Sequence, residues 1–120
     1  MAADIEAGYG ETPDAEMKSV AEIIRAGAVG ANLEDRTPRG ATLIRKISDA
    51  GDRIRAAREA ARAAANRHQR PHRSLSTCGT SATTRHASDE TVTGGEAYLT
   101  AGAECVYPIT LRDPGRSRDW

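Results

Sequence analysis

The sequence predicts an α/β protein built around parallel strands. Short apolar runs alternate with helical stretches along most of the 120 residues, and this alternation is typical of βαβ units. Two of the helical stretches begin at residues that cap helices, and apolar side chains recur at helical spacing. At this length the chain is at most one domain, with a modest core.

The first helix is well marked at both ends. Thr12 is a good helix cap, and Pro13 suits the first helical position. Four apolar residues then fall on one face of the helix: Met17, Val20, Ala21 and Ile24. Gly27 is placed to end the helix. Short strands are predicted on either side, one ending near Ile5 and one within AVGANLED.

Two further helices are predicted in the rest of the chain. The second runs roughly from Leu43 to Ala65, where Ala and Arg favour helix. Its apolar residues on or near one face are Ile44, Ile47, Ile54 and Ala61. The third begins at the cap Ser88 and ends near Gly102, and the apolar run AECVYPIT that follows predicts another strand.

The stretch between the second and third helices has a different composition. Residues 66–88, NRHQRPHRSLSTCGTSATTRHAS, are rich in Arg, His, Ser and Thr and nearly devoid of aliphatic residues. This composition predicts irregular structure. Its histidines and Cys78 do not have the spacing of a metal site.

The overall charge excludes some classes of partner. Seventeen basic residues balance seventeen acidic ones, so neither nucleic acid nor an anionic membrane surface is an expected partner. No apolar run is long enough to cross a bilayer, and the N-terminus lacks the pattern of a signal peptide. We therefore expect a cytoplasmic protein.

Acidic residues follow two of the predicted strands. Asp4 and Glu6 lie at the end of the first strand, and Glu34 and Asp35 lie at the end of the next. Parallel strands bring their carboxyl ends together, and clustered carboxylates need a cation or protons to offset their repulsion. Mg²⁺ with oxygen ligands would serve. The alternative is that these are ordinary solvated residues at strand ends.

Several segments, taken in order, resemble one enzyme superfamily. ADIEAGYG, a helix, AGAVGANLED, RIRAAREAA and DETVTGGEAYLTAGAECVYPITLRDPG are similar to successive segments of the isocitrate lyase/phosphoenolpyruvate mutase superfamily. Members are (β/α)8 barrels that bind Mg²⁺ and cleave or form C–C or P–C bonds beside a carboxylate. The resemblance implies that residues 1–115 are a partial TIM barrel, roughly its third to sixth β/α units, followed by a tail at 116–120.

The resemblance also implies a role for individual residues. Asp4 matches a direct Mg²⁺ ligand, whereas Glu6 and Glu34 match ligands that act through water. Gly8 and Tyr9 match the loop that meets the carboxylate of a small 2-oxo or 2-hydroxy acid substrate. Lewis-acid catalysis is the implied chemistry, and intact members are expected to be homo-oligomers. No residue of this chain is assigned as the catalytic acid or base.

The sequence departs from the superfamily in three respects. The loop RTPRGATLIRK lacks the Cys and His that lyases carry there, which favours the mutase-like branch that includes carboxyvinyl-carboxyphosphonate phosphorylmutase. The first two barrel strands are missing, as is the strand Ile-Asn-Ala-Arg-Thr-Asp, expected near residue 70.

Codons that can encode residues 68–73 also encode Ile-Asn-Ala-Arg-Thr when they are read one base later. We therefore interpret residues 66–88 as frameshifted and expect little or no activity. The alternative to an enzyme is an inactive degenerate gene product or a small non-enzymatic α/β binding module.

Overall fold

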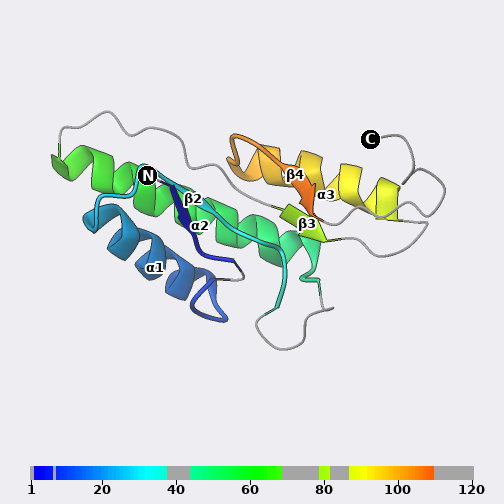
Figure 1. Cartoon of the computed structure of the whole chain (residues 1–120), viewed down its shortest axis with the longest axis horizontal. Helices are drawn as coiled ribbons and strands as arrows, with labels where there is room; N and C mark the ends of the chain where they lie inside the picture. The colour runs from blue at the N-terminus through cyan, green and yellow to red at the C-terminus, as the bar shows by residue number, and fades with distance from the viewer. Residues whose placement is uncertain (1, 7, 38–43, 69–78, 82–86, 110–120) are drawn as a thin grey trace.

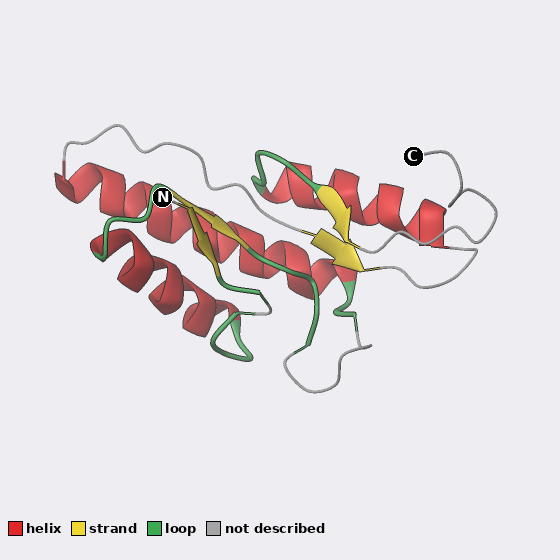
Figure 2. Cartoon of the chain, viewed as in Figure 1, coloured by secondary structure: helices red, strands yellow, loops and turns green. Residues whose placement is uncertain are grey.

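Strands and helices alternate along the whole described chain (Figures 1 and 2). The computed structural model describes residues 2–6, 8–37, 44–68, 79–81 and 87–109. The elements in order are β1 (Ala2–Asp4), α1 (Pro13–Arg25), β2 (Gly30–Asn32), α2 (Ile47–His68), β3 (Gly79–Ser81), α3 (Ala87–Ala101) and β4 (Tyr107–Ile109). The predicted α/β class is therefore confirmed.

Helix α1 has the ends that its sequence predicts. The hydroxyl of Thr12 accepts a hydrogen bond from the Ala15 N–H at 3.2 Å, and Pro13 is the first helical residue. At the other end Gly27 has a φ of +98°, and its N–H donates to the Ile24 carbonyl oxygen at 2.9 Å. A glycine in this left-handed conformation ends a helix without steric cost.

The described strands form two separate parallel pairs. In the first pair β1 lies beside β2, with Ala2 opposite Gly30 and Asp4 opposite Asn32. In the second pair β3 lies beside β4. No hydrogen bonds join β2 to β3. The sequence Gly-Thr-Ser of β3 has no large apolar side chain, so this strand cannot fill a central place in a sheet that is covered on both faces.

Helix α2 runs through the middle of the molecule, and α1 and α3 both pack against it (Figure 1). The core between these helices and the strands consists largely of small side chains. Its buried members are Ile5, Val20, Ala31, Leu33, Ala50, Ile54, Ala57, Ala60, Ala61, Tyr98, Ala101 and Ala103. Alanine lets the helices approach closely, but each alanine removes little apolar area from water.

The structure corrects two expectations about the second helix, its first residue and the placement of Ile44 on its apolar face. Helix α2 begins at Ile47, not near Leu43, and Ile44 instead forms an isolated antiparallel bridge with Arg36 and is 45% exposed. Leu43 itself lies outside the described residues. Ile44 is separated from the helix by residues 45 and 46, so it does not share the buried face of α2.

The segment predicted to be irregular contains regular structure in three places. Helix α2 continues to His68, β3 lies at 79–81, and α3 begins at Ala87. The helix continues because no glycine or proline interrupts it before Pro71. Residues 69–78 and 82–86, and the tail at 116–120, lie outside the described residues, and so does Cys78.

Candidate metal centre at the ends of β1 and β2

The β1–β2 pair packs one face against the helical core, and its other face carries exposed and half-buried residues. The residues on the packed face are Ala3, Ile5, Ala31 and Leu33; of these, Ile5, Ala31 and Leu33 are buried, and Ala3 packs against them. Because side chains alternate along a strand, Asp4 and its register partner Asn32 lie on the opposite face. Asp4 is exposed there and Asn32 is half-buried.

Backbone hydrogen bonds continue the pairing beyond the two strands. The Ile5 N–H donates to the Asn32 carbonyl oxygen at 3.0 Å, and the Glu34 N–H donates to the Glu6 carbonyl oxygen at 2.5 Å. The second bond places Glu6 and Glu34 side by side. Asp4, Glu6 and Glu34 therefore lie at the same end of one parallel pair.

Negative charge gathers around Glu34. Burial raises the pKa of the Glu34 carboxyl group, Arg36 opposes this shift, and the nearby carboxylates of Asp4, Glu6 and Asp35 raise the pKa further. The Arg36 Nε lies 3.7 Å from Glu34 Oε2. A cation at this end of the sheet would relieve the same repulsion.

The backbone bends sharply after Asp4. Glu6 has a φ of +46°, a left-handed conformation that L-residues other than glycine rarely adopt. One carboxylate oxygen of Asp4, Oδ1, accepts a hydrogen bond from the Glu6 N–H at 3.3 Å and so supports the bend. Strained residues of this kind are frequent at functional sites.

The carboxylates share one end of the sheet but do not form a closed cage. Among the residues that the structure describes, no group of three or more His, Cys, Asp or Glu side chains is arranged to hold a metal ion. Carboxylate oxygens on one rim nevertheless fit Mg²⁺, which binds through one or two carboxylates and keeps several waters. The donor chemistry therefore suits Mg²⁺ better than an ion that needs a complete protein cage.

The turn predicted to meet the substrate follows directly. Gly8 has a φ of +80°, and its N–H donates to the Ile5 carbonyl oxygen at 2.7 Å, so the chain folds back over the end of β1. Tyr9 is 75% exposed.

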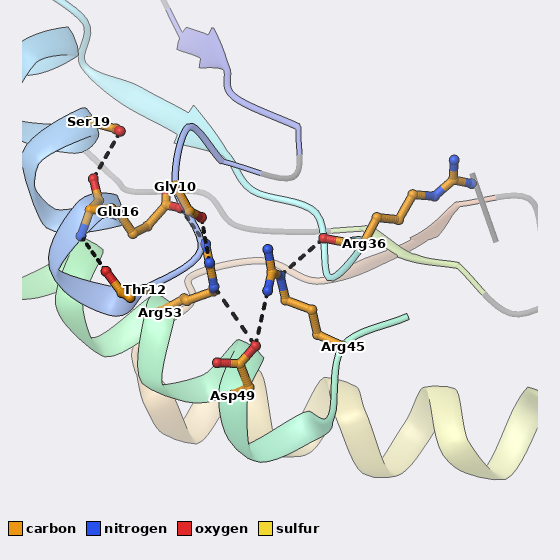
Figure 3. A network of polar contacts seen from close by, with 9 residues as sticks. Gly10, Thr12, Glu16, Ser19, Arg36, Arg45, Asp49 and Arg53 are labelled. Atoms are coloured by element: carbon orange, nitrogen blue, oxygen red, sulfur yellow. Dashed lines mark hydrogen bonds and ion pairs between the residues drawn. The ribbon is translucent and has the colours of Figure 1, made fainter. Parts of the chain in front are cut away.

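Three buried polar residues lie beside this site. The sequence placed one of them, Asp35, among the acidic residues at the strand ends, whereas it did not connect Glu16 and Arg53 with the site. Asp35 accepts a hydrogen bond from the Tyr98 hydroxyl at 3.0 Å, which links the loop after β2 to α3. Glu16 and Arg53 form a buried ion pair at 2.9 Å (Figure 3). The sequence did indicate that Glu16 is buried, since it lies four residues before Val20 and thus on the apolar face of α1.

No helix in the described part of the chain is both long and apolar enough to span a bilayer.

Parallel strands alternating with helices, with acidic residues at the carboxyl ends of neighbouring strands, define an α/β protein of the class that binds ligands at that edge. The family model described as phosphoenolpyruvate phosphomutase matches residues 1–118. The chain therefore belongs to the phosphoenolpyruvate phosphomutase family, within the isocitrate lyase/phosphoenolpyruvate mutase superfamily. No curated protein matches it.

Solved structures of the superfamily have the same fold. A protein assigned as a phosphonomutase from Burkholderia cenocepacia J2315 is 35% identical, with a TM-score of 0.76 over 95% of this chain and 46% of its own. A second protein from the same organism, assigned as a lyase/mutase, is 32% identical, with a TM-score of 0.75 over 95% of this chain and 40% of its own. A phosphonopyruvate hydrolase in complex with oxalate and Mg²⁺ is 25% identical, with a TM-score of 0.68 over 94% and 38%. The chain thus spans less than half the length of these relatives.

Proposed function

We propose that this chain carries a Mg²⁺ site at the carboxyl ends of β1 and β2 and binds a small 2-oxo or 2-hydroxy carboxylate beside it. Asp4 would bind the ion directly, and Glu6 and Glu34 would bind it through water. The observation that carries the proposal is the hydrogen bond from the Glu34 N–H to the Glu6 carbonyl oxygen at 2.5 Å, which joins the two acidic strand ends.

The arrangement of the sheet supports the same proposal. We assign the described elements to roughly the third to sixth β/α units of a (β/α)8 barrel. In such a barrel helices cover the outside, so the face with Asp4 and Asn32, opposite the face that packs on the helices, would face the interior. Ligands of these barrels bind at the carboxyl ends of the strands, where Glu6 and Glu34 lie.

The residues divide the chemistry between them. A bound Mg²⁺ supplies Lewis-acid stabilisation of negative charge that develops on substrate oxygens as a C–C or P–C bond breaks. The exposed Tyr9 hydroxyl would donate a hydrogen bond to the substrate carboxylate. Glu6 and Glu34 would orient water around the ion, and Asp4 would fix its position at the end of β1.

A related protein supports the choice of ion and ligand. The phosphonopyruvate hydrolase structure holds oxalate and Mg²⁺ together. Oxalate is a small dicarboxylate with two adjacent carboxyl groups, as expected for a mimic of a 2-oxo acid. It is therefore a suitable probe for this chain, together with Mg²⁺.

A specific observation also favours a non-enzymatic alternative. The described side chains form no metal-binding group of three, and Arg36 already offsets part of the charge of Glu34. On this alternative the chain is an inactive gene product or a small α/β binding module. Binding of Mg²⁺ separates the two hypotheses before any substrate is known.

Isothermal titration calorimetry with Mg²⁺ alone tests the proposal. The wild-type chain, folded by circular dichroism, is expected to give saturable heat that Asp4→Asn abolishes and Glu34→Gln weakens. Glu22→Gln is a matched control, because Glu22 pairs with Arg25 on the exposed face of α1, at 3.2 Å. If the folded wild-type chain gives no heat, the alternative is favoured and the metal site is rejected.

A further inference from the structure

One arginine lies next to the turn around Tyr9, close to the residues on both sides of it. Arg53, on α2, donates from Nη2 to the Gly10 carbonyl oxygen at 2.5 Å. Its Nη1 lies 3.2 Å from the position where a Cβ of Gly8 would be. Arg53 thus lies beside both neighbours of Tyr9, and Figure 3 shows its bond to Gly10.

Glu16, on α1, pairs with Arg53 and also lies against Gly8. Arg53 Nη1 donates to Glu16 Oε2 at 2.9 Å, and the two side chains are 1% and 0% exposed. A Cβ on Gly8 would clash with the same carboxylate oxygen, Oε2. The backbone of Gly8 therefore rests directly against the ion pair, and only glycine allows this approach at its φ of +80°.

A second acidic residue steadies the other edge of the guanidinium. Asp49 Oδ2 lies 3.9 Å from Arg53 Nε and 3.2 Å from Arg45 Nη1. Arg45 in turn donates from Nε to the Arg36 carbonyl oxygen at 3.1 Å, in the loop after β2 (Figure 3). The same small network thus reaches the loops that follow both strands of the candidate site.

Stability alone is a poor explanation for this pair. Removing two charges from water is costly, and buried ion pairs often stabilise a protein no more than apolar residues would. The buried Glu16 Oε1 also has no hydrogen-bond partner among the described residues, which adds to the cost. What the pair does provide is a guanidinium of fixed orientation. Glu16 holds the Arg53 guanidinium so that it donates a directional hydrogen bond to the Gly10 carbonyl oxygen.

We propose that Arg53, oriented by Glu16, is the positioning residue of the Gly8–Gly10 turn and sets where Tyr9 meets a substrate carboxylate. The second half of this statement rests on the proposed function, whereas the first half does not. Lysine at position 53 would keep the charge, but its single ammonium cannot reproduce the two-pronged contact with Glu16 and Gly10.

Two measurements on Arg53→Lys test the proposal. Hydrogen exchange of the amides at 8–11 is expected to speed up about tenfold, because the turn loses a charge-assisted bond, while amides in the middle of α2 keep their rates. Calorimetry with oxalate in saturating Mg²⁺ is expected to show affinity about tenfold weaker, with Mg²⁺ affinity itself within about twofold of wild type. This separation would not arise from a general loss of stability.

A matched control and a second test variant come from the same helices. Arg55→Lys alters an exposed pair with Asp52 at 2.7 Å on α2 and should change neither measurement. Glu16→Gln keeps the shape and an acceptor for Arg53 and should give a smaller increase in exchange at the turn. If Arg53→Lys does not fold, Glu16→Gln decides the matter by the same two measurements.

The outcomes are distinct. Unchanged exchange at 8–11, or an equal rise in α2, overturns the positioning role. Faster exchange at the turn with equal weakening of Mg²⁺ and oxalate binding overturns the selective effect on substrate. If wild type binds neither Mg²⁺ nor oxalate, the proposed function fails, and the exchange measurement still decides whether Arg53 positions the turn.

Discussion

Glu6 has a backbone conformation that is sterically unfavourable for any residue with a side chain. Its φ of +46° is left-handed, and this conformation costs about 1–2 kcal/mol in an L-residue. Glycine would adopt it freely. A proposed metal ligand that sits in a strained position directly beside Glu34 is consistent with selection for a site at some expense of stability.

Replacement of Glu6 by glycine or alanine tests this idea. Both changes remove the carboxylate, but only glycine removes the backbone strain, so Glu6→Gly should be more stable than Glu6→Ala by about 1 kcal/mol. Urea denaturation measures the difference. Equal stabilities, or a more stable alanine variant, would show that the left-handed conformation at this residue is not strained.

The ionisation of Glu16 gives a second expectation at the residue scale. Burial raises the pKa of its carboxyl group above the ordinary 4.5, and Arg53 and Arg45 only partly offset this shift. The native state then binds a proton more tightly than the unfolded state. Its contribution to the free energy of unfolding is therefore fully present below pH 4.5 and is lost as the pH rises through the raised value.

Glu16→Gln should remove this component of the pH dependence. Between pH 4 and neutrality, the free energy of unfolding of wild type should fall relative to that of the variant, as followed by urea denaturation at a series of pH values. Glu22→Gln, on the exposed face of α1, should leave the wild-type profile unchanged. A wild-type curve that rises relative to the Glu16→Gln curve would mean that the ion pair with Arg53 outweighs burial.

At the scale of elements, a buried side-chain hydrogen bond connects the candidate site to α3. The Tyr98 hydroxyl donates to Asp35 Oδ2 at 3.0 Å, and both residues are buried. Asp35 follows Glu34 directly, and its carbonyl oxygen accepts a hydrogen bond from the Arg45 N–H at 2.7 Å. Helix α3 therefore contributes to fixing the loop that carries Glu34, although it lies far away in the sequence.

Tyr98→Phe should destabilise the chain by about 1 kcal/mol or somewhat more, since it removes a buried hydrogen bond to a carboxylate. Thermal denaturation followed by circular dichroism measures the loss. Tyr9→Phe is the matched control, because Tyr9 is 75% exposed and its hydroxyl adds little to folding. Equal melting temperatures for the two variants would contradict a structural role for the Tyr98 hydroxyl.

Local signals predicted the elements well and their pairing less well. Thr12, Pro13 and Gly27 mark the ends of α1 because capping depends on neighbouring residues only. The pairing of β3 with β4, separate from β1 and β2, depends on contacts between distant segments that no local pattern specifies. The extension of α2 to His68 was missed because composition outweighed helix propensity in the prediction.

In the candidate site, too, local features could be predicted from the sequence and contacts between distant segments could not. Asp4, Glu6 and Glu34 could be placed at one sheet edge from the sequence, since parallel pairing alone brings strand ends together. Arg53 could not be connected with the Gly8–Gly10 turn, because their contact depends on how α2 packs against α1. Positive φ at Glu6 also leaves no mark in the sequence, where a glycine would have signalled it.

At the scale of the whole molecule, the chain has a small alanine-rich core and two separate strand pairs. It matches less than half the length of its solved relatives. The frameshift interpretation of residues 66–88 stays a prediction, and the nucleotide sequence of those codons would test it. The proposed metal site does not depend on a frameshift in residues 66–88, because it depends on the local geometry at β1 and β2.

Paramagnetic broadening by Mn²⁺, which shares the oxygen-rich coordination of Mg²⁺, locates a bound ion directly by nuclear magnetic resonance. We predict that substoichiometric Mn²⁺ broadens the backbone amide signals of Ile5, Glu6 and Glu34 first, and that excess Mg²⁺ restores them. Uniform broadening, or broadening centred on the exposed Asp89 and Glu90 of α3, would contradict a metal centre at the ends of β1 and β2.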